Sequence, residues 1–155
     1  MRQYETFELR FHGEPLTENY ADIPLTAVFS CDGEVKTVKG FYDGDGQYVI
    51  RFLPEQTGEY TWKVTGLFEE EGNEFCEPAS KGNHGFVKAV RTHFEYEDGT
   101  TYIPFGTTVY ALVHQTDELV KETLATLRKA PFNKIRLCVF PKDYEYNHNE
   151  PPFYP

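Results

Sequence analysis

Apolar and polar residues alternate along much of the first half of the chain. Phe7, Leu9 and Phe11, for example, are separated by charged residues, which is the period-two pattern of a half-buried strand. Glycine, proline and aspartate interrupt this pattern at short intervals, as in the turn-forming pair Asp32-Gly33. The alternation predicts an antiparallel β-sandwich, with strands at residues 4–12, 25–31, 35–42, 48–52 and 58–64.

Aromatic residues hold inward positions on the last two of these strands. The inward set consists of Tyr48, Ile50 and Phe52 on one strand and Tyr60, Trp62 and Val64 on the next. Trp62 is the expected anchor of the core, since a buried aromatic side chain contributes a large apolar area. Residues 69–74 are acidic and contain a glycine, so we expect an exposed loop there. Two shorter strand-like pieces follow, near Phe75 and at residues 85–90.

A strand, a helix and a second strand follow in the last third of the chain. Asp98-Gly99 predicts a hairpin turn, residues 105–112 predict a buried strand, and residues 133–140 predict another. Between these two strands, residues 117–129 begin with acidic and end with basic side chains, as the helix dipole favours. The expected apolar face of this helix consists of Leu119, Val120, Leu124 and Leu127.

Two apolar strands joined by a helix lie parallel and need cover on both faces of their sheet. Such a unit is typical of α/β sheets and (β/α)₈ barrels, but a closed barrel needs about 250 residues, whereas this chain has 155. We therefore predict a sandwich at residues 1–92 and the N-terminal fragment of a barrel at residues 93–155. Its uncovered apolar surface is expected to make the isolated chain self-associate, or to leave that part mobile.

The charge of the chain narrows the classes of partner. A formal net charge of −10 argues against nucleic acid and against a membrane surface, because both attract Lys and Arg. A neutral sugar is compatible with this negative charge. The three cysteines have no CxxC spacing, so we expect them to be reduced. The N-terminus lacks an apolar signal segment and no membrane-spanning run follows, which predicts a cytoplasmic protein.

Two groups of motifs carry a resemblance to known families. Gly40-Phe-Tyr-Asp-Gly, Tyr48-Val-Ile-Arg-Phe-Leu-Pro and Thr57-Gly-Glu-Tyr-Thr-Trp resemble immunoglobulin-like domains of formally unknown function, which precede proteins assigned as glycoside hydrolases in bacteria. Thr101-Tyr-Ile-Pro-Phe-Gly-Thr-Thr and Phe132-Asn-Lys-Ile-Arg are similar to the opening of the apiosidase-like, clan-A type (β/α)₈ catalytic domains that follow such sandwiches. The two resemblances together cover nearly the whole chain, in the matching order.

The resemblance implies a glycosidase whose two catalytic carboxylates sit on later barrel strands, so no catalytic residue is expected in this chain. It implies that the end of the first strand and its loop line a sugar cleft. It also implies that Arg136 points into the barrel and keeps the nucleophilic carboxylate ionised. The expected substrate-binding residues are Tyr110, His114, Gln115, Arg136, Lys142 and Tyr144, with Tyr146 on the same loop as the last two.

Simpler interpretations of these residues stay open. Without the resemblance, Arg136 is equally well explained as an arginine on a strand whose side chain reaches solvent. His114 is either a sugar contact or a polar residue that ends a strand. Asp43-Gly-Asp-Gly lacks the remaining ligands of a calcium loop, so turn chemistry explains it better, and we expect neither a metal site nor a cofactor.

The leading hypothesis is the N-terminal part of a glycoside hydrolase that acts on plant-type polysaccharide or oligosaccharide. This chain by itself is then inactive, and the sandwich has a structural or accessory role. The alternative is a stand-alone carbohydrate-binding or structural sandwich module. A binding module of this kind needs a row of solvent-facing aromatic residues on one sheet, whereas Tyr48, Tyr60 and Trp62 alternate as core residues do.

Overall fold

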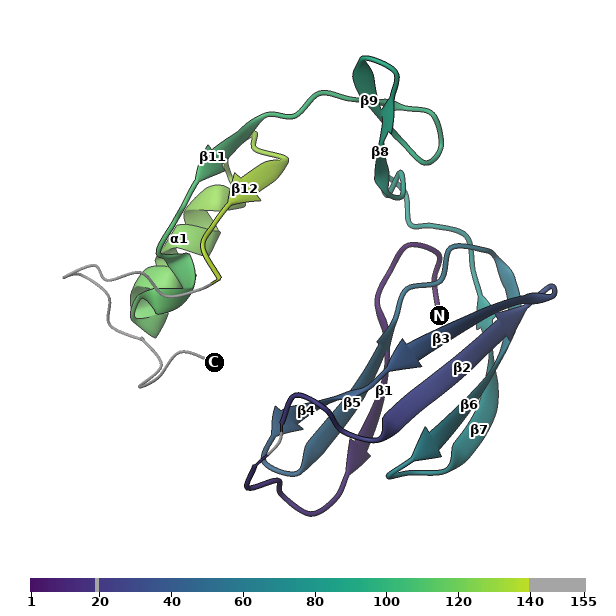
Figure 1. The fold of residues 1–155 in the computed structure, drawn as a ribbon. Coiled ribbons are helices and arrows are strands. Elements are labelled where there is room, and N and C mark those ends of the chain that lie inside the picture. The colour runs from purple at the N-terminus through teal and green to yellow at the C-terminus, as the bar shows by residue number, and fades with distance from the viewer. Residues whose placement is uncertain (19, 140–155) are drawn as a thin grey trace. The chain divides into compact units, whose positions relative to one another are not determined.

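The computed structural model describes residues 1–18 and 20–139 and contains mostly β-strands (Figure 1). The chain divides into two compact units, Met1–Thr101 and Tyr102–Pro155, and each is considered by itself. The predicted mostly-β architecture with several antiparallel sheets is confirmed, and no closed barrel is present among the described residues. The predicted domain boundary after Thr92 stays a prediction; the first compact unit extends to Thr101.

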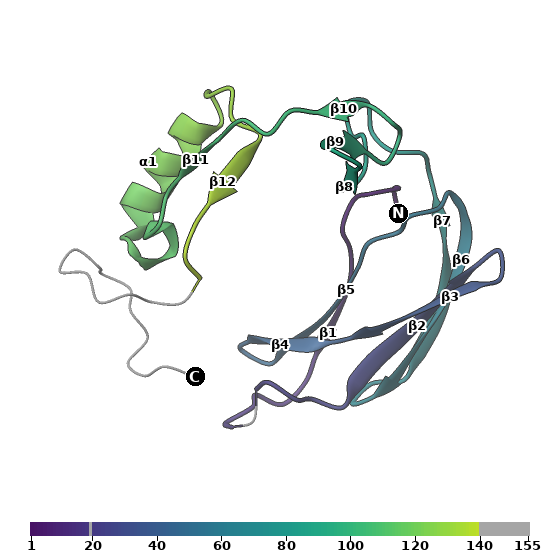
Figure 2. The ribbon, with the colours of Figure 1, turned by 45° about the horizontal axis from the view of Figure 1, so that its top comes forward.

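The first unit contains two antiparallel sheets that enclose a common core (Figure 2). The order of strands in the larger sheet is β3-β2-β6-β7 and in the smaller one β1-β5-β4. The larger sheet consists of β2 (Leu25–Cys31), β3 (Glu34–Lys39), β6 (Gly58–Gly66) and β7 (Glu70–Cys76). The smaller sheet consists of β1 (Phe7–His12), β4 (Phe41–Gly44) and β5 (Gln47–Phe52).

Aromatic rings connect the two sheets across this core. The rings of Phe29 on β2 and Phe52 on β5 are stacked with 3.9 Å between their centroids, and Tyr60 on β6 meets the edge of Phe52. The side chains predicted to point inward from β5 and β6 do so, and Trp62 is half-buried against the same core. Because successive strand residues point to opposite faces, the alternation in the sequence was sufficient to identify this set.

Two sequence predictions in this unit are wrong. The strand expected at residues 35–42 divides at Gly40 into β3 and β4, which belong to different sheets. A Cβ atom on Gly40 would lie 2.5 Å from the side chain of Leu25, which is fully buried, so a larger residue at the crossing point would displace part of the core. The acidic residues 69–74 are not a loop, because β7 pairs along its length with β6. Their exposure was expected correctly, and charged side chains suit an edge strand because they discourage further pairing.

A small antiparallel sheet, ordered β10-β9-β8, lies toward the end of the first unit. It consists of β8 (Val87–Val90), β9 (His93–Tyr96) and β10 (Thr101–Tyr102). The predicted turn at Asp98-Gly99 is confirmed, and Gly99 adopts the positive φ of 84° that glycine tolerates. The turn is tied to the preceding segment, since the Asp98 carboxylate meets Nδ1 of His84 at 2.7 Å.

The second unit has the predicted strand, helix and strand. β11 (Gly106–Thr108) and β12 (Lys134–Arg136) pair in parallel, and between them lie the 3₁₀-helix η1 (Leu112–His114) and the helix α1 (Asp117–Leu127). The hydroxyl of Thr116 caps α1 by accepting a hydrogen bond from the backbone N–H of Leu119.

The second unit exposes apolar side chains, as expected for a fragment without its neighbours, but the strand predicted to be buried at residues 105–112 is mostly exposed or half-buried. All three residues of β12 are exposed, and so are Leu119 and Leu124 of the expected apolar helix face, whereas Val120 and Leu127 are half-buried. A parallel pair needs cover on both faces, and the described residues supply too little of it. No described helix is long and apolar enough to cross a membrane.

Candidate functional site

The strongest candidate site lies where the two parallel strands end. Beyond β11 and β12 the pairing continues, because the N–H of Val109 donates to the carbonyl of Arg136 at 2.8 Å and the N–H of Cys138 donates to that of Tyr110 at 3.0 Å. The guanidinium carbon of Arg136 then lies 5.5 Å from the centre of the Tyr110 ring. Two of the six predicted substrate-binding residues are therefore in contact.

This contact combines an aromatic ring with a guanidinium group. A guanidinium over an aromatic ring is held by a cation–π interaction, which leaves its N–H donors available for other acceptors. Tyr110 is 40% exposed and Arg136 is also exposed. None of the described carboxylates forms an ion pair with Arg136. The pair thus brings an aromatic ring and several hydrogen-bond donors together where the two strands end.

His114 and Gln115 lie just after this pair in the chain. His114 is the last residue of η1 and only 5% of it is exposed, and its backbone N–H donates to the carbonyl of Ala111 at 3.0 Å. Gln115 follows in an extended conformation and is half-buried. Burial favours a packing role for His114, while Gln115 keeps part of its side chain accessible. Their sugar contacts, like those of Tyr110 and Arg136, stay predictions.

Lys142 and Tyr144 lie outside the described residues, as does Tyr146. The described residues also contain no cluster of three or more His, Cys, Asp or Glu side chains that could hold a metal ion. Cys31 and Cys76 are buried thiols, and burial raises the pKa of both. Raised thiol pKa values favour packing over nucleophilic chemistry at these two positions.

Carboxyl groups with clearly shifted pKa values lie in the first unit. Hydrogen bonds from Arg51 and Arg10 lower the pKa of Glu8, and one from Arg2 lowers the pKa of Glu77. The pKa of Asp98 falls to about 2, chiefly because of its hydrogen bond with His84. A glycosidase acid needs a raised pKa, whereas the pKa values of these three carboxyl groups are lowered, so none of them fits that role.

One polar residue beside the candidate site was not singled out from the sequence. Asn133 directly precedes β12, and its side-chain amide forms hydrogen bonds with the backbone of Ile103 and of Phe105. The available signal was an asparagine at the start of a strand whose partner segment contains a proline, Pro104. That signal becomes meaningful only when the pairing of the two segments is known.

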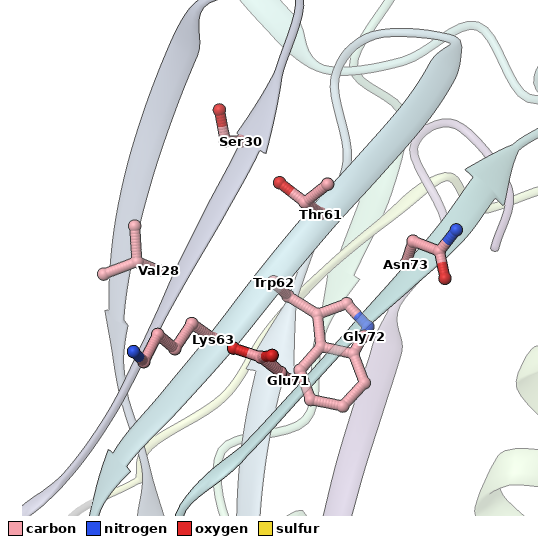
Figure 3. A pocket seen from close by; sticks show the side chains of 8 residues that line it. All are labelled: Val28, Ser30, Thr61, Trp62, Lys63, Glu71, Gly72 and Asn73. Carbon is pink, nitrogen blue, oxygen red and sulfur yellow. The ribbon is translucent and has the colours of Figure 1, made fainter.

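A shallow hollow of about 570 Å³ lies on the larger sheet of the first unit (Figure 3). Its lining consists of Val28, Ser30, Thr61, Trp62, Lys63, Glu71, Gly72 and Asn73. Most of these residues alternate with core residues and so belong to the outer face. Trp62 is opposite Phe29, which is buried, and its indole lies across Gly72, so the ring belongs to the inner face. Trp62 is the aromatic residue in the lining of this hollow.

Comparisons with known proteins found one family model and one solved structure that resemble this chain. A family model described as a domain of unknown function, DUF5060, matches residues 1–66. The crystal structure of a protein from Bacteroides vulgatus ATCC 8482, described as a "putative glycoside hydrolase", is 42% identical to this chain with a TM-score of 0.84. The match covers 99% of this chain and 31% of that one, so the chain spans about a third of its neighbour's length. No curated protein matches the chain.

Proposed function

We propose that this chain forms the N-terminal part of a glycoside hydrolase that acts on plant-type polysaccharides or oligosaccharides. The observation that carries the proposal is the 42% identity and the TM-score of 0.84 to the Bacteroides protein over 99% of the chain. Residues 1–92 would then be an immunoglobulin-like sandwich with a structural or accessory role. Residues 93–155 would begin the (β/α)₈ catalytic domain.

The exposure of β11 and β12 supports the proposal that residues 93–155 begin a (β/α)₈ domain. Parallel strands are normally buried on both faces, whereas β12 is wholly exposed. Exposed apolar side chains of the second unit include Ile103, Phe105, Ile135 and Val139. Further β/α units on either edge of the parallel pair would cover such a surface, and the neighbour's greater length is compatible with them.

The chain alone is expected to be inactive. Hydrolysis of a glycosidic bond needs two carboxyl groups that flank it, but the strand ends near Tyr110 and Arg136 carry apolar residues such as Val109 and Leu137 instead. Tyr110 and Arg136 would line the sugar cleft, and Arg136 would hold the carboxylate of a later strand ionised. Carbohydrate is the proposed partner, through contacts to this pair.

Reading the source DNA downstream of the Pro155 codon tests the proposal. We expect an open frame that encodes further β/α units, with two strand-end Glu or Asp residues. A stop codon directly after Pro155 would overturn it. A complementary assay incubates the 155-residue chain with soluble xyloglucan and arabinoxylan, and sugar release at an enzyme-like rate would contradict the expected inactivity.

A further inference from the structure

The side chain of Asn133 joins two segments that the backbone alone pairs poorly. Its Oδ1 accepts a hydrogen bond from the N–H of Phe105 at 2.9 Å, and its Nδ2 donates to the carbonyl of Ile103 at 2.9 Å. The Tyr102 hydroxyl donates to the same Oδ1 at 3.4 Å. The backbone N–H of Asn133 also donates to the carbonyl of Phe105 at 2.9 Å.

Pro104 explains why an amide is needed at this point. Proline has no N–H, so the segment from Ile103 to Phe105 cannot offer a regular ladder to a neighbouring strand. The amide of Asn133 has both a donor and an acceptor, and it reaches the groups on either side of Pro104. An aspartate of the same shape would keep the acceptor and lose the donor to Ile103.

These contacts lie directly before the parallel pair, whose register is sensitive to small shifts. Gly106 pairs with Lys134 and Thr108 pairs with Arg136. A Cβ atom on Gly106 would lie 2.3 Å from the carbonyl oxygen of Lys134, so a shift by one residue would bring a side chain into this contact. Such a shift would also turn Arg136 to the opposite face of the sheet, away from Tyr110.

We propose that Asn133 is a positioning residue, which sets the register of β11 and β12 and thereby holds Arg136 over the ring of Tyr110. The importance of Asn133 for sugar binding rests on the proposed function. The effect of Asn133 on the register of β11 and β12 does not depend on that function. Asn133 contacts no substrate in this scheme. It acts through Tyr110 and Arg136, which would contact the sugar.

The test is NMR spectroscopy of the 155-residue chain, with and without the change Asn133→Ala. Side-chain protons of Arg136 above the Tyr110 ring should show an upfield ring-current shift, and Tyr110→Leu gives the value without the ring. In Asn133→Ala we expect this shift and the Arg136–Tyr110 cross-peaks to fall by more than half. Asn73→Ala is the matched control, because Asn73 also donates one side-chain hydrogen bond, to Glu59, but lies in the first unit.

An Asn133→Ala chain that keeps the shift while its second unit stays folded would overturn the proposal. If that variant unfolds the second unit, Asn133→Asp decides the question, because it retains the acceptor for Phe105. Partial loss of the shift in this variant supports the proposal, and an unchanged shift overturns it. Titration of the unaltered chain with a xyloglucan oligosaccharide tests the proposed function separately, because unmoved Tyr110 signals would count against sugar binding and leave the register result intact.

Discussion

The two units bury their apolar side chains to very different extents. In the first unit, β2 buries every second residue, and Leu25, Ala27 and Phe29 are at most 1% exposed. In the described part of the second unit, the buried side chains are Leu112 and His114, while all of β12 is exposed. The strands differ as well, because β2 has the sequence Leu-Thr-Ala-Val-Phe-Ser-Cys, whereas β11 is Gly-Thr-Thr and β12 is Lys-Ile-Arg.

The difference shows that the alternation pattern of a strand identifies its apolar face. It does not identify which residues will cover that face. In the first unit two sheets supply each other's cover, as the stacked rings of Phe29 and Phe52 demonstrate. In the second unit a helix lies beside a two-stranded sheet (Figure 1 and Figure 2), and within residues 102–139 little else meets the pair. A unit of this kind depends on neighbours for most of its hydrophobic stabilisation.

The largest effect is expected from the core of the first unit. Phe29→Ala should lower the free energy of unfolding by about 3–5 kcal/mol, because it removes a buried ring and leaves a cavity. Urea unfolding followed by the fluorescence of Trp62, the single tryptophan, measures this. Phe75→Ala is the control, since Phe75 is 63% exposed and should cost less than about 0.5 kcal/mol. Equal losses in the two variants would contradict the assignment of the core.

A smaller effect, confined to the second unit, is expected from Gly106→Val. The new side chain would collide with the Lys134 carbonyl and should destabilise the parallel pair by about 1–3 kcal/mol. Hydrogen exchange of residues 106–108 and 134–136 should accelerate, while the unfolding reported by Trp62 stays unchanged. Thr108→Val is the control at an exposed position of the same strand. A change in the Trp62 transition would mean that the units unfold together.

Self-association should depend on the exposed apolar surface of the second unit. Ile103 is 74% exposed and Val139 is 72% exposed, so the double change to lysine should shift the chain from oligomer toward monomer in sedimentation experiments. Val35→Lys, at a position that is 62% exposed in the first unit, should leave the mass unchanged. A chain that is monomeric from the start would contradict the predicted self-association.

The smallest effect is a dependence of the β9–β10 turn on acid. The pKa of Asp98 is lowered from 3.8 to about 2, mainly by its hydrogen bond with His84. A lowered pKa means that the ionised group stabilises the fold above about pH 4 and that this contribution disappears as the pH falls toward 2. Amide protection around Gly99 should decline over this range, and Asp98→Asn should flatten the decline. An identical decline in Asp98→Asn would exclude this pair as its cause.

Sequence reasoning predicted most of the first unit because its information is local. Alternation located β2 at its observed bounds and identified Tyr48, Ile50 and Phe52 as inward-facing residues, and Asp98-Gly99 gave the correct turn. It failed at Gly40, where the chain changes sheets, because period-two patterns do not say which sheet a strand joins. It also failed at β7, because acidic edge strands resemble loops in composition.

For the candidate site, the sequence supplied residue types and the fold supplied their proximity. Tyr110 and Arg136 were named from a resemblance, and their contact depends on the parallel register of β11 and β12. Asn133 was missed because its partners, Ile103 and Phe105, are about thirty residues away in the chain. Side-chain hydrogen bonds to distant backbone leave almost no local signal.

The sequence by itself determined most of the strands of the first unit, the helix, the Asp98-Gly99 turn and which strand faces are apolar, because propensities and periodicity act over a few residues. The tertiary structure alone decided which sheets share a core, that β7 pairs with β6, and that Arg136 lies over Tyr110. It also decided which apolar side chains of the second unit are exposed, such as Ile103 and Val139. Burial is a property of what lies opposite a face, and no local pattern contains that information.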